Sequence, residues 1–187
     1  LAANLVDEED HIAHGGGIYN AGTGVSLLGC TIMTNIASGD IAGSGGGVYS
    51  TSPGDINLTD CTILSNQSTH FGGGLQMSNG DLTLVNCDVS YNATGTNGGG
   101  LRWAGSTSVL QITGGSFIGN ATTDPGSLGG GGIYCGPGQS SINNVDISGN
   151  QSAGSGGGML YYMLTIHDRG THTLSNCTVV GNSGGHG

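Results

Sequence analysis

Residues 98–120 read GGGLRWAGSTSVLQITGGSFIGN, and this stretch sets a pattern that the rest of the chain repeats. A glycine triplet opens it, short runs of alternating apolar and polar residues follow, and Asn120 ends it. Such alternation is typical of β-strands, and no stretch of the chain keeps the 3.6-residue period of an amphipathic helix. The stretch therefore predicts short strands separated by turns rich in Gly, Asn, Asp and Ser.

Glycine triplets and asparagines recur together along the chain. The triplets begin at Gly15, Gly45, Gly72, Gly98, Gly130 and Gly156. The asparagines, 26 to 32 residues apart, are Asn35, Asn66, Asn92, Asn120, Asn150 and Asn182. Self-similarity at such a period indicates a solenoid, because one repeat cannot bury its apolar side alone.

Apolar residues keep fixed places relative to each asparagine. Three residues before it stand Ile32, Ile63, Val89, Phe117, Ile147 and Val179. Eight residues before it stand Leu27, Leu58, Leu84, Ile112, Ile142 and Leu174. This frame predicts one all-β domain over residues 1–187: a right-handed parallel β-helix of about six coils of 26–32 residues, with three short strands per coil.

Both ends of the chain continue the repeat. The recurring asparagines are here called ladder asparagines. Asn4 occupies the position expected for the ladder asparagine of an earlier coil, and residues 182–187 end where the next glycine triplet is expected. Neither end has the polar cap that solenoids need, and Leu1–Ala13 lacks the features of a signal peptide. We therefore expect a segment of a longer solenoid or fibre, whose uncapped ends stack head to tail on other copies.

These motifs resemble the repeats of the chlamydial polymorphic outer membrane proteins and related bacterial β-helix proteins. That family is marked by GGA before an aliphatic residue and by FxxN. Phe117–Asn120 matches FxxN, and Gly15–Ile18 matches the other motif with Gly in place of Ala. The resemblance implies a surface-displayed passenger, often an adhesin, exported through an autotransporter barrel. It implies an extracellular or cell-surface location on a bacterium.

Charge is scarce, and most of it is acidic. Charged residues make up 7% of the chain, the net charge is −10, and the only basic residues are Arg102 and Arg169. Nucleic-acid binding needs Lys and Arg to displace counterions, so no nucleic-acid partner is expected. No apolar run of 18 residues occurs, so this segment is not expected to insert into a membrane. The partners expected are further copies of the chain and host or matrix glycans and proteins.

The cysteines and asparagines are expected to be structural. Cysteines stand five residues before a ladder asparagine at Cys30, Cys61, Cys87 and Cys177. We expect a buried thiol ladder, because free Cys packs as a small hydrophobe; a disulfide or a metal site is the alternative. Stacked asparagines hydrogen-bond to one another, so the sequons are interpreted as products of the repeat: Asn57, Asn66, Asn92, Asn120, Asn150 and Asn176.

An aromatic column is the candidate glycan or partner surface. Tyr19, Tyr49 and Tyr134 each follow a glycine triplet by two residues, Arg102 holds the same place, and Trp103 is adjacent. We expect these side chains to face outward, where aromatic rings stack on sugars or form an interface. The alternative is simple strand propensity.

Acidic residues offer two further candidates. Asp88 and Asp146 share one repeat position about 10 Å apart, near the carboxylate separation of inverting glycosidases, but no basic residue recurs beside them. The cluster Asp7, Glu8, Glu9 and Asp10 is a candidate Ca²⁺ site or a solvated loop. No catalytic residue and no other cofactor is assigned. A non-enzymatic structural or adhesive stalk is the preferred function, with a carbohydrate-binding or polysaccharide-cleaving β-helix as the alternative.

Overall fold

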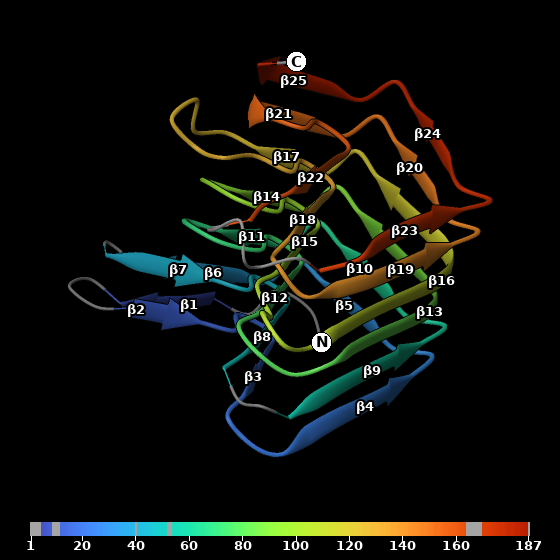
Figure 1. Ribbon diagram of the computed structural model, residues 1–187. Coiled ribbons are helices and arrows are strands. Elements are labelled where there is room, and N and C mark those ends of the chain that lie inside the picture. The colour runs from blue at the N-terminus through green and yellow to red at the C-terminus, as the bar shows by residue number, and fades with distance from the viewer. Residues whose placement is uncertain (1–4, 9–11, 40, 52–53, 164–169, 187) are drawn as a thin grey trace.

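The chain forms a parallel β-solenoid around a single core (Figure 1). The computed structural model describes residues 5–8, 12–39, 41–51, 54–163 and 170–186. Over these residues all strand pairs are parallel and no helix forms, so none is present that could cross a membrane. The predicted right-handed parallel β-helix is confirmed, with about five turns. Six ladder asparagines enclose five complete turns, which accounts for the difference from the six coils expected.

The strands that follow the glycine triplets form a six-stranded sheet, here called the glycine-side sheet. In spatial order they are β3 (Ile18–Asn20), β8 (Val48–Ser50), β12 (Leu75–Met77), β15 (Leu101–Trp103), β18 (Ile133–Cys135) and β22 (Met159–Tyr161). Each has three residues, so the central side chain points away from the core while its neighbours point inward.

The long sheet has ten strands in two arms. The arm before the cysteine position contains β4 (Gly24–Leu28), β9 (Asp55–Thr59), β19 (Gln139–Asn143) and β23 (His172–Ser175). The arm after it contains β5 (Thr31–Met33), β10 (Thr62–Leu64), β20 (Asp146–Ser148) and β24 (Thr178–Val180). β13 (Leu82–Ser90) and β16 (Val109–Ile118) run through both arms, because their pairing resumes one residue past Asn86. In these two coils the expected short strands are therefore merged.

The third face is a seven-stranded sheet beside the asparagines, here called the asparagine-side sheet. Its strands are β1 (Leu5–Glu8), β6 (Ile36–Gly39), β11 (Gln67–Ser68), β14 (Ala93–Thr94), β17 (Ala121–Thr122), β21 (Gln151–Ser155) and β25 (Ser183–His186). A two-stranded sheet of β2 (Ile12–His14) and β7 (Ala42–Ser44) precedes the first two glycine triplets.

Each coil turns at positions where the backbone is left-handed. One position lies six residues before the ladder asparagine and is occupied by Gly29, Asp60, Asn86, Gly114, Asn144 and Asn176. Another lies directly before that asparagine and is occupied by Thr34, Ser65, Tyr91, Gly119, Gly149 and Gly181. Gly, Asn and Asp adopt positive φ most readily, and they occupy the first position in every coil. At the second position only the three glycines fit this preference, while Thr34, Ser65 and Tyr91 do not.

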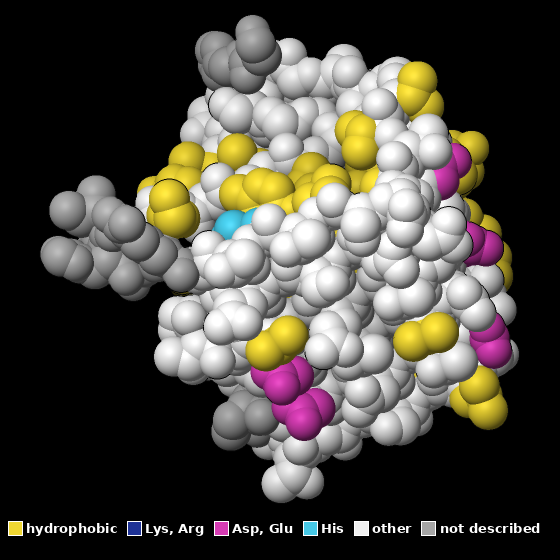
Figure 2. All heavy atoms as spheres, turned by 45° about the vertical axis from the view of Figure 1, so that its right-hand side comes forward, with side chains coloured by type: hydrophobic (Ala, Val, Ile, Leu, Met, Phe, Trp, Pro, Cys, Tyr) yellow, Lys and Arg dark blue, Asp and Glu magenta, His cyan; other side chains and the backbone are white. Residues whose placement is uncertain are grey.

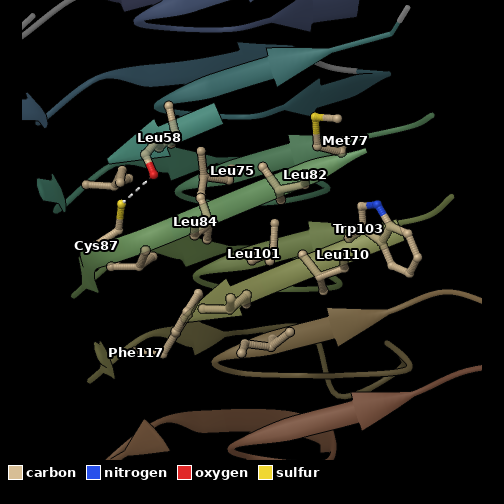
Figure 3. Packing of buried hydrophobic residues seen from close by; sticks show 14 of the residues in the cluster. Leu58, Leu75, Met77, Leu82, Leu84, Cys87, Leu101, Trp103, Leu110 and Phe117 are labelled. Carbon is tan, nitrogen blue, oxygen red and sulfur yellow. Dashed lines mark hydrogen bonds between the residues drawn. The ribbon is translucent and has the colours of Figure 1, made fainter. Parts of the chain in front are cut away.

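Inward side chains stack into one continuous core. Phe117 and Trp103 are 0% exposed, as are Leu58, Leu84 and Ile63. Figure 3 shows the layers, with Leu82 above Leu110 and Met77 above Trp103 on successive strands. The same ladder positions become exposed in the last described coil, where Leu174 is 40% and Val179 56% exposed.

Candidate binding groove beside the glycine-side sheet

Each glycine triplet turns the chain so sharply that residues on its two sides meet. The first glycine has φ between 59° and 75° in all six triplets. At the second there is no space for a side chain: a Cβ on Gly73 would lie 2.4 Å from the carbonyl oxygen of Ala93. His14 and Tyr19, on the two sides of one triplet, have ring centroids 6.3 Å apart, and His14 also stacks on Tyr49 of the next coil at 4.0 Å. The residue before a triplet, such as His14 or Phe71, therefore packs beside the strand of the next coil. These residues are here called the wall.

The central residues of the six strands form one outward column, here called the outer column. Its members, joined by parallel register, are Tyr19, Tyr49, Gln76, Arg102, Tyr134 and Leu160. Their neighbours in sequence, such as Leu101 and Trp103, belong to the core cluster, whereas Arg102 does not. The outer column and the residues before the triplets that flank it are together called the groove here, and the hollow itself lies at Phe71, Arg102 and Tyr134.

The first part of the groove is an aromatic stack of His14, Tyr19 and Tyr49. The His14 and Tyr49 ring planes differ by 3°, and Tyr19 lies 5.8 Å from Tyr49 with planes 7° apart. Tyr19 is 54% exposed and Tyr49 8%. Burial lowers the pKa of His14, which favours the neutral ring, and a hydrogen bond with the Ala13 backbone opposes this in part. Within this stack, Tyr19 is the ring that is exposed to solvent.

Arg102 occupies the middle of the groove between aromatic rings. Its guanidinium carbon lies 4.2 Å from the ring centre of Phe71 and 5.4 Å from that of Tyr134. Burial lowers the pKa of Arg102, while the nearby phenols of Tyr134 and Tyr49 raise it. Burial also raises the pKa of Tyr134 to about 12. A pocket of about 340 Å³ opens here, with Asn97 and Tyr162 in its lining.

Two expectations about the aromatic residues need correction. Trp103 was expected on the outer surface, but it is 0% exposed and donates from Nε1 to the carbonyl of Gly80 at 3.4 Å. Alternation along β15 places it on the same side as Leu101. Tyr49 and Tyr134 do belong to the outer column, yet they are only 8% and 4% exposed. The wall residues and neighbouring rings cover them, so Tyr19 is the exposed tyrosine among the three.

The ladder asparagines form a continuous hydrogen-bonded column from Asn35 to Asn182. Each Nδ2 donates to the Oδ1 of the next asparagine at 2.9 to 3.0 Å. From Asn66 onward, each also donates to a carbonyl of the preceding coil, as Asn92 does to Ile63 at 2.9 Å. Asn66, Asn92, Asn120 and Asn150 are 0% exposed.

The cysteines of the repeat also form a column, and all five cysteines of the chain are free thiols. Each column thiol donates to the carbonyl two residues earlier, as Cys87 does to Val85 at 3.4 Å. Cys87 also bonds to the carbonyl of Leu58 (Figure 3). Burial raises the pKa of Cys87 to about 11 and that of Cys135 still further. Cys30 and Cys177 are partly exposed.

The acidic candidates lie apart from the groove. Asp88, Ser116 and Asp146 are adjacent in register on the long sheet, and Ser116 donates to Asp88 at 2.9 Å. The aspartate and tyrosine columns thus stand on different sheets and form no common site. The cluster Asp7, Glu8, Glu9 and Asp10 lies outside the residues whose side chains are described. Elsewhere in the described chain, no three His, Cys, Asp or Glu side chains form a metal site.

Sequence reasoning missed the wall of the groove. His14 and Phe71 occupy the place before a triplet, but the other coils carry Ser44, Asn97, Gly129 and Ser155 there, so no repeat pattern singles the position out. Gln76, which the sequence places in the outer column, is 2% exposed with an unpartnered Oε1. The signal available was the sharp turn itself, because the glycine triplet brings its two flanks together.

The resemblance to the chlamydial repeats depends on short motifs, the glycine triplets and the residues Phe117–Asn120. The two motifs are in contact in the fold, because the third glycine of each triplet packs against the side chain of a ladder asparagine. Comparison of the chain with protein-family models, with curated proteins and with solved structures gave no match.

Proposed function

We propose that the chain is a rigid, non-enzymatic structural or adhesive segment of an extracellular or cell-surface protein. The observation that carries this proposal is the unbroken asparagine ladder. In a middle coil each ladder asparagine donates three hydrogen bonds. Asn92, for example, donates from its backbone N–H and from Nδ2 to Oδ1 of Asn120 in the next coil. Its Nδ2 also donates to the carbonyl of Ile63 in the preceding coil. Stacked amide ladders of this kind add to the high stability of cross-β structures.

Charge distribution supports a passive scaffold. In Figure 2 the acidic side chains are dispersed singly or in pairs, and most of the face drawn is uncharged. With two Arg residues and no Lys, the chain also offers trypsin-like proteases little to cleave. Such a surface suits a rod that persists outside a cell.

Head-to-tail stacking of copies is part of the proposal. At one end a hollow of about 150 Å³ is lined by the apolar residues Ile18, Leu27 and Ile32. At the other end Leu174 and Val179 present the matching ladder positions. A second copy in register would bury both surfaces, as a heterologous contact that propagates along an axis.

Electron microscopy of the purified chain tests this function. We expect filaments that lengthen with concentration, and their loss in Val179→Asp, which puts a charge on the end surface. Val180→Asp is the matched control, because it adds the same charge to the adjacent position of β24, whose side chain points the other way. Isolated rods one chain long at high concentration, with no longer species, would refute self-stacking.

Glycan binding by the groove is a second candidate, favoured by the exposed ring of Tyr19 in its stack with His14 and Tyr49. Aromatic faces of this kind offer sugar rings a stacking surface. Binding to a panel of neutral oligosaccharides, weakened in Tyr19→Ala but not in Leu28→Ala, would support it. Leu28 is 73% exposed and lies on the long sheet, so it reports on nonspecific surface effects.

A further inference from the structure

Arg102 lies between aromatic rings in an acidic protein. The chain carries a net charge of −10. Within the described residues, however, no carboxylate pairs with this guanidinium, and its Nε is buried without a hydrogen-bond partner. Partial burial of a charge is unfavourable unless the charge is compensated. The rings of Phe71 and Tyr134 supply cation–π attraction, which compensates the buried charge only in part.

The pocket beside Arg102 combines a few polar groups with apolar and aromatic side chains, as small-molecule sites do. Asn97 Oδ1 accepts from the backbone N–H groups of Leu128 and Gly129 at 3.1 and 3.2 Å. This fixes the amide and leaves its Nδ2 as the donor end. Tyr134 and Tyr162 lie 6.0 Å apart with ring planes tilted by 32°. Guanidinium, amide and aromatic rings thus line one hollow of about 340 Å³.

We propose that this pocket binds an acidic sugar unit, with its carboxylate on the Arg102 guanidinium and its ring against the flanking aromatic side chains. A guanidinium presents a planar fork of N–H donors that matches a carboxylate in two parallel hydrogen bonds. The proposal rests on the glycan-binding function of the groove, to which it adds the chemistry of the ligand.

The charge of the whole chain limits the kind of glycan. A polymer with a carboxylate on every ring would meet the repulsion of an acidic surface, whereas a single acidic unit in an otherwise neutral glycan would meet it only weakly. The pocket volume lies at the small end of the range for ligand sites, which suits one ring. We therefore expect sparse acidic units, and not polyanions, as ligands.

Isothermal titration with matched sugar pairs tests the proposal. Sialyllactose is compared with lactose, and a glucuronate-terminated oligosaccharide with its glucose-terminated counterpart, so the two sources of carboxylate are distinguished. We expect at least one acidic member to bind roughly tenfold more tightly than its neutral partner. Arg102→Gln should remove that preference, and Arg102→Lys should restore only part of it. Tyr91→Ser, at the turn between β13 and β14 and outside the glycine-side sheet, should leave binding unchanged.

A chemical readout on the unaltered protein covers the case in which Arg102→Gln does not fold. Phenylglyoxal modifies guanidinium groups, and Arg102 and Arg169 are the two arginines of the chain. We expect the acidic sugar, but not lactose, to slow modification of Arg102, measured by mass spectrometry of the peptide that contains it. Equal protection by acetate would overturn the assignment to a sugar.

The outcomes separate the two proposals. Equal binding of acidic and neutral sugars, or full binding by a folded Arg102→Gln protein, would overturn the role of Arg102 and leave glycan binding by the groove intact. Absence of binding to every sugar, with no protection of Arg102, would overturn both.

Discussion

At the scale of single residues, the third glycine of each triplet explains why glycines and asparagines recur together. A Cβ on Gly74 would lie 3.0 Å from Cγ of Asn92 and 2.6 Å from the carbonyl oxygen of Gly100. The other triplets repeat this contact, as Gly100 does with Asn120. The asparagine ladder runs through space that only glycine leaves open. The two motifs are therefore one structural unit.

Replacement of Gly74 by Ala tests this coupling. Overpacking against backbone and a buried amide should lower the free energy of unfolding by about 2–3 kcal/mol. Gly149→Ala is the matched control, because φ there is +63° but nothing lies within 4 Å of the new Cβ. It should cost about 1 kcal/mol, the penalty of a left-handed alanine. Urea unfolding followed by the fluorescence of Trp103, the single tryptophan, measures both variants. Equal losses would contradict the coupling.

Burial of the thiols makes a second prediction at this scale. Since the pKa of Cys87 is about 11 and that of Cys135 is higher still, both thiols should resist iodoacetamide in the native protein at pH 8. Cys30 and Cys177 are partly exposed and should react first. Mass spectrometry of peptides after timed alkylation measures this order, and urea should make all five cysteines reactive. Native alkylation of Cys87 as fast as that of Cys30 would contradict the buried column.

At the scale of elements, the strands and their register could be predicted, but the walls between strands could not. The apolar frame before each asparagine, such as Ile63 and Leu58, identifies inward positions because strand alternation is local. The same alternation should have assigned Trp103 to the core beside Leu101. Burial of Tyr49 was not predictable in this way, because His14 covers it from the preceding coil. Contacts between coils depend on turn geometry that the strand pattern does not contain.

The asparagine column makes its own prediction through Asn92→Ala. The truncation removes the amide that donates to the carbonyl of Ile63 and accepts two hydrogen bonds from Asn66. The Ile63 carbonyl and the two Asn66 donors then stay buried without these bonds. Buried unsatisfied groups cost about 1–3 kcal/mol each, so a total loss of roughly 4 kcal/mol is expected. Asn57→Ala, on the exposed side of β9, should change stability little. Denaturant titration compares the two variants, and a similar small loss in both would show that the ladder contributes little.

At the scale of the whole molecule, the core and the groove place opposite demands on the same three-residue strands. Leu101 and Trp103 join the core while Arg102 faces out between them, so β15 serves both the rod and the binding surface. Because parallel register repeats this arrangement in every coil, a change of one outward residue alters the groove without disturbing the ladder. The solenoid is thus a stable frame on which the outer column can vary independently.

Acid stability is the last prediction at this scale, and it depends on two half-buried histidines. Burial lowers the pKa of both His14 and His172 from their ordinary value near 6.5. The unfolded chain therefore binds protons at these histidines more readily than the folded chain. Their contribution to the free energy of unfolding is complete above about pH 6.5 and is lost as the pH drops below it. The urea midpoint, followed through Trp103, should decrease between pH 7 and pH 5, a range above the usual carboxyl titrations. In the double variant His14→Gln, His172→Gln this decrease should be much smaller, whatever its absolute stability. A decrease of unchanged size in that variant would assign the acid response to other groups.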